Sequence, residues 1–349
     1  MSSNRKLKYS LAIREALHQT MAEDPSVFLI GQGVKSPWYV GNTTEGLLEE
    51  FGRSRVIDSP VSENGITGAA VGAAIAGMKP VVVHPRMDFM FYALDPIINQ
   101  AANWCYMNGG KASVPVVIWG IVNRGGEQAA QHSQSLQAMF AHIPGLKVVM
   151  PSTPYDAKGM MIAAIRDPNP VIFVDDRWLY GIEGQVPKES YEVKIGRAKV
   201  RRIGTSITLV SASFMVHESI KAAEQLDKLG IGTDVIDLRT VKPIDTTMIL
   251  ESVRKTGRLI VADGGWKTCG LSAEIAALVS ENAFEHLKVP IRRVTLPDCP
   301  APASSVLEKA YYPTAEDIVR AAREMMAPSR EALPVEIWRE KPSRKAQVA

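Results

Sequence analysis

Cysteine is scarce in this sequence, and the cysteines that it has lie far apart. The 349 residues contain Cys105, Cys269 and Cys299. Three cysteines at these separations favour neither a disulfide framework nor a cysteine-rich zinc site. We interpret them as small apolar side chains.

Charge of one sign and long apolar runs are scarce as well. The formal net charge is +3 with both signs interspersed, so nucleic acid and acidic membrane surfaces are poor candidates as partners. No apolar run approaches the length of a membrane span, and the N-terminus leads into a helical pattern instead of a signal-peptide core. A cytoplasmic protein without membrane contact is expected.

Several motifs that carry chemistry are also missing from the sequence. No Gly-x-Gly-x-x-Gly follows a strand pattern, and neither Gly-x-x-x-x-Gly-Lys nor Gly-x-Ser-x-Gly occurs. No group of histidines, cysteines and carboxylates has the spacing of metal ligands. The sequence therefore gives no support to dinucleotide binding, to a phosphate-binding P-loop or to a serine nucleophile.

Apolar runs of strand length alternate with helical patterns along the chain. Continuous Val/Ile runs separated by helices predict parallel sheets covered on both faces. A polar interval at 184–202 predicts a boundary, and the length and the 46% hydrophobic content fit two domains. We expect an α/β fold of two doubly wound domains, residues 1–190 and 191–330, followed by a C-terminal tail at 331–349.

The helical pattern that begins at Glu63 is the most unusual stretch. Asp58-Ser59-Pro60 predicts a turn, and Ser62 is expected to cap the helix that follows. One face of that helix carries almost no side chain: Gly65, Gly68, Ala69, Gly72, Ala73 and Ala76. Each glycine costs a helix about 1 kcal/mol relative to alanine. Tight packing against another helix and room for a flat ligand or a partner chain are both consistent with this face.

A second candidate is the small-residue segment 123–134, which contains His132 immediately before a helix that Ser133 is expected to cap. Histidine has a free pKa suited to proton transfer near neutrality. Ligands of parallel sheets bind beyond the carboxyl ends of the strands. His84, the segment 123–132 and Asp175-Asp176-Arg177 all follow predicted strands and are expected to share one rim. Glu63 and His132 are the candidate catalytic pair, and a histidine that only hydrogen-bonds its loop is the alternative.

Several motifs stand in a fixed order along the chain. They are Ser62-Glu63-Asn64-Gly65, Ala129-Ala130-Gln131-His132-Ser133-Gln134, the stretch 143–149, Ala164-Ile165-Arg166-Asp167, Leu179-Tyr180-Gly181 and Ile236-Asp237-Leu238-Arg239-Thr240. On these residues the chain closely resembles the beta subunits of thiamine-diphosphate-dependent 2-oxo acid dehydrogenases over roughly residues 5–328. Pyruvate, branched-chain and acetoin dehydrogenases belong to this group, within the transketolase superfamily. The resemblance implies a pyrimidine-binding domain followed by a transketolase C-terminal-like domain.

The resemblance assigns roles to four residues. Glu63 matches the glutamate that hydrogen-bonds the aminopyrimidine ring of thiamine diphosphate and favours its imino tautomer. Phe89 matches the aromatic residue that lies against the pyrimidine, with an ordinary core phenylalanine as the alternative. Gln32 joins the cofactor site at a position where relatives usually carry an acid. His132 matches the histidine near the substrate and the incoming acceptor.

The resemblance also implies partners and ions. In this family an alpha subunit supplies the Gly-Asp-Gly motif that holds Mg²⁺ and the diphosphate. The nearest segment here, Asp263-Gly264-Gly265, has the wrong order, so half a site and an α2β2 heterotetramer are expected. A lipoyl acyltransferase is a further expected partner. Four residues match a structural monovalent-cation (K⁺) site of some relatives, although 167–170 is equally a plain turn: Val116, Ala164, Asp167 and Asn169.

His84, Arg86 and Arg124 depart from the family pattern. They either lie on the solvated rim or recognise a substrate larger and more polar than pyruvate. The leading hypothesis is a dehydrogenase beta subunit that acts on a small 2-oxo acid or acetoin and passes an acyl group to a lipoyl carrier. The alternative is a split transketolase-like transferase that passes a ketol or acyl unit to an aldehyde or sugar. The presence of Glu63 and His132 argues against a third hypothesis, a scaffolding subunit without catalysis.

Overall fold

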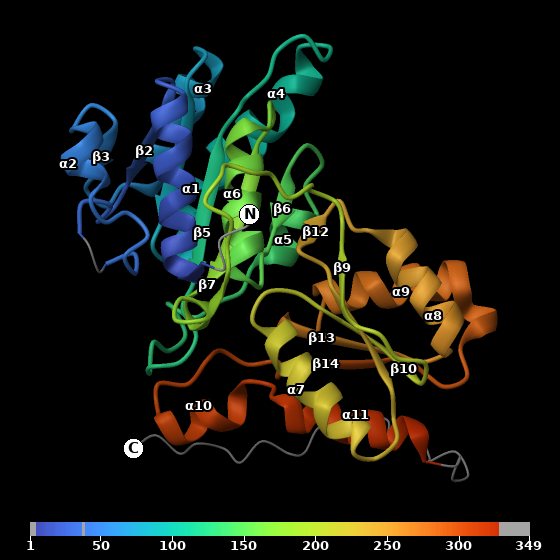
Figure 1. Cartoon of the computed structure of the whole chain (residues 1–349). Helices are drawn as coiled ribbons and strands as arrows, with labels where there is room; N and C mark the ends of the chain where they lie inside the picture. The colour runs from blue at the N-terminus through green and yellow to red at the C-terminus, as the bar shows by residue number, and fades with distance from the viewer. Residues whose placement is uncertain (1–4, 37–38, 328–349) are drawn as a thin grey trace, which may run out of the picture.

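The computed structural model describes residues 5–36 and 39–327, and the tail expected at 331–349 lies outside them. Within this described part, a seven-stranded sheet organises the first half of the chain in the order β12-β6-β7-β5-β4-β2-β3 (Figure 1). Its strands are β2 (Val27–Gly31), β3 (Val56–Asp58), β4 (Lys79–His84), β5 (Val117–Val122), β6 (Lys147–Val149), β7 (Val171–Asp176) and β12 (Thr240–Lys242). All neighbours are parallel except β12, which comes from the second half and pairs antiparallel with β6.

Different helices cover the two faces of this sheet, as Figure 1 shows. Helices α1 (Tyr9–Glu23) and α6 (Pro154–Arg166) pack side by side on one face. The other face carries α3 (Glu63–Ile75), η1 (Met87–Ala93), η2 (Asp95–Ala101), α4 (Ala102–Met107) and α5 (Gln137–Ala141). Successive strand residues point into opposite cores, so Val81 and Val83 contact the α1 side and Val82 the α3 side. Burial on both faces explains the unbroken apolar runs of the sequence.

The second half folds around its own sheet. In the described residues this sheet has five strands in the order β14-β13-β10-β11-β9, with β9 antiparallel at the edge. They are β9 (Lys199–Arg202), β10 (Ile207–Ser211), β11 (Thr233–Asp237), β13 (Leu259–Trp266) and β14 (Arg292–Leu296). Helices α7 (Met215–Asp227) and α11 (Ala315–Met326) cover one face, and α8 (Thr246–Thr256) and α9 (Leu271–Ala283) cover the other. The division at residue 190 stays a prediction.

Short elements complete the chain. They are the pair β1 (Lys6–Lys8) and β8 (Glu183–Gln185), with α2 (Leu47–Phe51), η3 (Arg177–Leu179), η4 (Phe284–His286) and α10 (Ser305–Tyr311). No helix in the described ranges is both long enough and apolar enough to cross a membrane.

Two expected helix caps are wrong. Ser62 precedes α3, but its side chain makes no capping hydrogen bond. Ser133 precedes no helix, because α5 begins only at Gln137. The backbone before Ser133 takes positive φ values at Glu127 (60°) and Ala129 (58°), which keeps this segment in an irregular loop.

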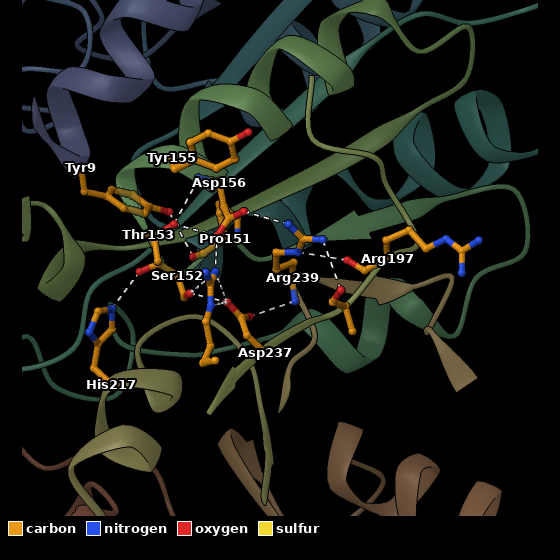
Figure 2. A network of polar contacts seen from close by, with 12 residues as sticks. Tyr9, Pro151, Ser152, Thr153, Tyr155, Asp156, Arg197, His217, Asp237 and Arg239 are labelled. Atoms are coloured by element: carbon orange, nitrogen blue, oxygen red, sulfur yellow. Dashed lines mark hydrogen bonds and ion pairs between the residues drawn. The ribbon is translucent and has the colours of Figure 1, made fainter. Parts of the chain in front are cut away.

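A buried ion network joins the two halves (Figure 2). Asp156 lies in the first turn of α6, whereas Arg201, Asp237 and Arg239 come from the second half. The Arg201 guanidinium contacts both carboxylates and lies 2.6 Å from Asp237 Oδ2, and Arg239 Nη1 donates to Asp156 Oδ1 at 2.9 Å. Ser152 Oγ donates to Asp237 Oδ2 at 2.5 Å. Two carboxylates and two guanidinium groups therefore balance in charge.

Burial and pairing act in opposite directions on the two acids. Burial raises the pKa of Asp237 although Arg201 opposes the shift. Burial also acts to raise the pKa of Asp156, but Arg201 and Arg239 outweigh it and hold that pKa below its usual range. Arg201 therefore favours the ionised form of Asp237, against the effect of burial.

We predict that Arg201→Gln lowers the free energy of unfolding by about 3–5 kcal/mol, because it leaves buried carboxylates without their shared cation. Urea unfolding followed by circular dichroism measures the change. Arg254→Gln, at an exposed position of α8, is the matched control and should shift the midpoint little. Equal midpoints for both variants would contradict this role of the network.

Candidate active site

A small cleft lies at the carboxyl ends of β2 and β4, beside the first turn of α3. The two strands are parallel and paired in register, so the residues that follow them lie at the same edge. The lining residues are Gln32, Pro60, Ser62, Glu63, Ile66, Val83, His84, Pro85, Arg86 and Phe89. Gln32, Glu63, Arg86 and Phe89, which the sequence singles out, are thus neighbours.

Glu63 is the first residue of α3 and is half-buried. The turn after β3 brings the chain back to the sheet edge, and the helix N-terminus favours a negative charge at this position. Its carboxylate has no hydrogen-bond or ion-pair partner among the described residues. A carboxylate with free acceptor positions, facing a cleft, is available to a ligand.

Phe89 and His132 come together from two different elements. Phe89 belongs to η1, and its ring centroid lies 5.4 Å from that of His132 with an 85° angle between the rings. Edge-to-face packing of this kind fixes both rings. His132 therefore lies next to the cleft, within reach of a ligand that contacts Phe89.

Asp88 is a site residue whose role sequence reasoning missed. It is buried, and its Oδ1 accepts the backbone N–H of Gln134 at 3.1 Å, which ties the His132 loop to η1. Burial raises the pKa of Asp88, and the Gln134 N–H and the nearby His132 partly oppose that shift. Its position beside Phe89 was visible in the sequence, but its partner lies 46 residues away.

The structure gives no support to a substrate role for His84. Its side chain is buried under α3, where Nε2 lies 3.1 Å from Thr67 Oγ1. Burial lowers its pKa to about 4, so the imidazole is neutral at physiological pH. It adds no positive charge to the cleft.

Arg124 also lies away from the cleft. Its side chain is only 3% exposed, and its Nε lies 2.5 Å from Asp176 Oδ2. The guanidinium carbon sits over the rings of Trp178 and Tyr312, at 6.0 and 5.8 Å from their centroids. Its charge is paired with Asp176 inside the protein, and its contact with the Tyr312 ring holds the loop 123–132 against the second half. This geometry gives no support to a substrate role.

Of this trio, His84 and Arg86 line the cleft, and Arg86 is the one that brings a positive charge there. It is half-buried, and its guanidinium donates to Pro85 O at 2.9 Å and to Gln128 Oε1 at 3.3 Å. Both acceptors are neutral, so its positive charge is available at the cleft.

The four residues expected to bind a monovalent cation lie close together, but their oxygens are largely engaged. Asp167 Oδ2 pairs with Lys147 Nζ at 2.5 Å, and Asp167 Oδ1 accepts the N–H of Asn169. The carbonyl oxygens of Val116 and Ala164 each accept a backbone N–H. Asn169 Oδ1 is buried without a partner. Lys147 thus supplies the positive charge that Asp167 needs, and a cation at this position stays a prediction.

The side chains at the cleft suit one part of thiamine diphosphate. An unpartnered carboxylate beside an aromatic ring suits a flat aminopyrimidine, which hydrogen-bonds along its edge and packs on its face. The diphosphate and its metal ion find no matching residues here. In the described ranges no group of three or more His, Cys, Asp or Glu residues could hold a metal ion.

Comparison with known proteins places both halves of the chain. Residues 5–182 match the transketolase pyrimidine binding domain, and residues 196–318 match the transketolase C-terminal domain.

Three curated relatives are similar over nearly their whole length. The beta subunit of acetoin:2,6-dichlorophenolindophenol oxidoreductase of Cupriavidus necator is 46% identical over 332 residues, which cover 92% of this chain and 98% of the relative. The protein of the same name from Bacillus subtilis is 41% identical over 92% of this chain and 98% of its own length. The pyruvate dehydrogenase E1 component subunit beta of Rickettsia felis is 43% identical over 90% of this chain and 96% of its own.

A solved structure shares the fold. The structure titled "Split gene transketolase, inactive beta4 tetramer" aligns with a TM-score of 0.76 at 22% identity, covering 93% of this chain and 99% of that chain. The two doubly wound α/β domains are thereby confirmed.

We predict that burial of neutral His84 costs stability in acid. Because its folded-state pKa of about 4 lies below the usual 6.5, the unfolded chain binds the proton first, and stability falls as the pH drops below 6.5. Between pH 8 and pH 5 this loss is about 2 kcal/mol, and His84→Gln should remove it. Urea unfolding at both pH values measures the difference between wild type and variant. His286→Gln, at an exposed histidine, is the control. The same pH dependence in wild type and His84→Gln would contradict the burial effect.

Proposed function

Because this chain belongs to the beta subunits of the thiamine-diphosphate-dependent 2-oxo acid and acetoin dehydrogenases of the transketolase superfamily, we propose that Glu63, Phe89 and His132 form its half of the active site. The family predicted from the motifs is confirmed. The enzyme acts on a small 2-oxo acid or acetoin and passes the acyl group to a lipoyl carrier. The observation that carries the site assignment is the partnerless Glu63 carboxylate, which shares a cleft with Phe89.

Each of these side chains has a task that follows from its position. Thiamine diphosphate, when bound, supplies a nucleophilic carbon and an electron sink for cleavage of the bond beside a carbonyl. Glu63 would hold a proton between its carboxylate and a ring nitrogen of the pyrimidine. Phe89 and Gln32 would position that ring, one by packing and the other by hydrogen bonding. His132 would exchange a proton with the substrate oxygen, since a histidine at the cleft edge suits this task.

An alpha subunit would complete the site with the residues that bind Mg²⁺ and the diphosphate. The bare face of α3 supports such a partner, because the described residues of this chain leave it uncovered at Gly68 and Gly72. Gly72 and Ala76 are exposed, and a Cβ added at Gly68 or Gly72 would meet nothing within 4 Å. Exposed Phe91 and Tyr92 come from η1, which packs against α3. An α2β2 heterotetramer, a lipoyl acyltransferase partner, bound K⁺ and a cytoplasmic location remain predictions.

We predict that Glu63→Gln reduces turnover at least about 100-fold, because an amide cannot hold the proton that a carboxylate shares with the pyrimidine. The chain is co-expressed with its alpha subunit and supplied with thiamine diphosphate and Mg²⁺. Reduction of 2,6-dichlorophenolindophenol with acetoin or pyruvate then measures turnover. Glu281→Gln, at an exposed position of α9, is the matched control. Full turnover by Glu63→Gln in an intact complex would disprove the assignment.

We predict that Gly72→Leu abolishes association with the alpha subunit but leaves the chain folded. Leucine is the better helix former by about 1 kcal/mol, and a Cβ at this position meets nothing within 4 Å among the described residues. Gly72→Ala keeps the face narrow and should still associate. Co-purification with a tagged alpha subunit tests both variants, and circular dichroism checks their folding. Wild-type association by the leucine variant would contradict an interface at this face.

A further inference from the structure

Two arginines follow strands of the same sheet that are separated by a single strand, and Arg86 lines the cleft. Arg86 follows β4 by two residues, and Arg177 directly follows β7. Strand β5 lies between them in register, since Gly120 pairs with both His84 and Val174. Strands two places apart are about 9.6 Å from each other, a gap that two arginine side chains can close. After burial, the charge of Arg177 is the next cause that lowers the pKa of Arg86, so the two guanidinium groups are within range of mutual electrostatic repulsion.

Neither guanidinium is neutralised within the described part of the chain. Arg86 donates to Pro85 O and Gln128 Oε1, and Arg177 donates to the carbonyl oxygen of Tyr39. Neither forms an ion pair with a described carboxylate, and the buried Nε of each has no acceptor. The buried Arg124 and Arg201 are instead paired with acids.

Two acids near this pair, Asp175 and Asp88, have pKa values that burial raises. Asp175 is buried, and burial raises its pKa to about 7, so much of it is protonated at neutral pH. Its Oδ2 accepts the Tyr180 hydroxyl at 3.0 Å. Asp88 also has a raised pKa because it is buried, and it accepts the Gln134 N–H. Two adjacent guanidinium groups therefore keep a net positive charge, which suits bidentate binding of a carboxylate or phosphate.

We propose that Arg86 and Arg177 bind an anionic group at the far end of the substrate. This inference rests on the proposed function and narrows its substrate class. Arg86 shares the cleft with Glu63 and Phe89, and its partner Gln128 belongs to the loop that carries His132. A ligand held by the two arginines would therefore extend from the reacting carbonyl toward the rim.

The chemistry of the reaction indicates which anionic group this is. A carboxylate that leaves as CO₂ loses its charge in the reaction, so arginines holding it would stabilise the ground state more than the transition state. The pair instead suits a second carboxylate or a phosphate ester away from the bond that breaks. Pyruvate and acetoin lack such a group. The substrate class is a 2-oxo acid with a distal anionic group.

The test compares three substrates with the reconstituted complex and a dye acceptor: pyruvate, 2-oxoglutarate with a distal carboxylate, and phosphohydroxypyruvate with a distal phosphate. The expected result is a kcat/KM at least about tenfold higher for one distal anion than for pyruvate. Arg86→Gln and Arg177→Gln should each reduce this preference about 10- to 100-fold, mainly through KM. The better of the two anionic substrates identifies the source of the anion. Arg254→Gln is the control and should keep the preference.

A binding measurement separates this inference from the proposed function. Calorimetry with inorganic phosphate and with malonate should show binding to the wild-type complex that each glutamine variant weakens. Arg86→Lys and Arg177→Lys should bind with intermediate affinity, because they keep the charge without the planar fork. Turnover of pyruvate without any preference for distal anions would overturn the inference and leave the function standing. Arginine-dependent anion binding without turnover of any 2-oxo acid or of acetoin would support the pair and contradict the function. Failure of wild type to bind either anion would overturn the pair.

Discussion

The parallel register of β2, β4, β5 and β7 is the constraint on which the candidate site depends. Parallel strands end at the same edge, so residues up to 145 positions apart, such as Gln32 and Arg177, reach one rim. Burial on both faces fixes that register, because a one-residue slip would turn each apolar side chain into the wrong core. The site is therefore as rigid as the sheet beneath it.

Contacts with the second half of the chain hold the elements that carry this rim. The Arg201 network joins the end of β11 to the start of α6 (Figure 2). Arg124 pairs with Asp176 and lies over the ring of Tyr312, which anchors the loop that carries His132. Glu127 adds two hydrogen bonds to α10. Its backbone N–H donates to Glu308 Oε2, and its Oε1 accepts the backbone N–H of Ser305, the first residue of α10. The buried charge of Arg201 thus joins the halves, whereas Arg86 and Arg177 form no ion pair with a described carboxylate.

Two features of the described residues fit an active site that a second chain completes. The cleft offers a partnerless carboxylate and an aromatic ring but no group of metal ligands in the described ranges. The helix that carries Glu63 exposes its small residues, although glycines weaken a helix in isolation. Both features would be explained by a second chain that approaches α3 closely and brings the diphosphate-binding residues, as we propose.

The sequence alone predicted the two α/β halves, and it singled out Glu63, Phe89 and His132, which the structure places in or beside one cleft. Unbroken apolar runs and ordered motifs are local signals, so they can be recognised without knowing the tertiary structure. The order of strands in the sheet is not local. The strand order decided that His84 is buried and neutral and that Arg124 pairs with Asp176. It also brought the charge of Arg177 within electrostatic range of Arg86. A charged residue after a strand has the same sequence signature whether it faces a ligand or another part of the chain. Only the tertiary structure, which sets distances between residues remote in sequence, distinguished these cases.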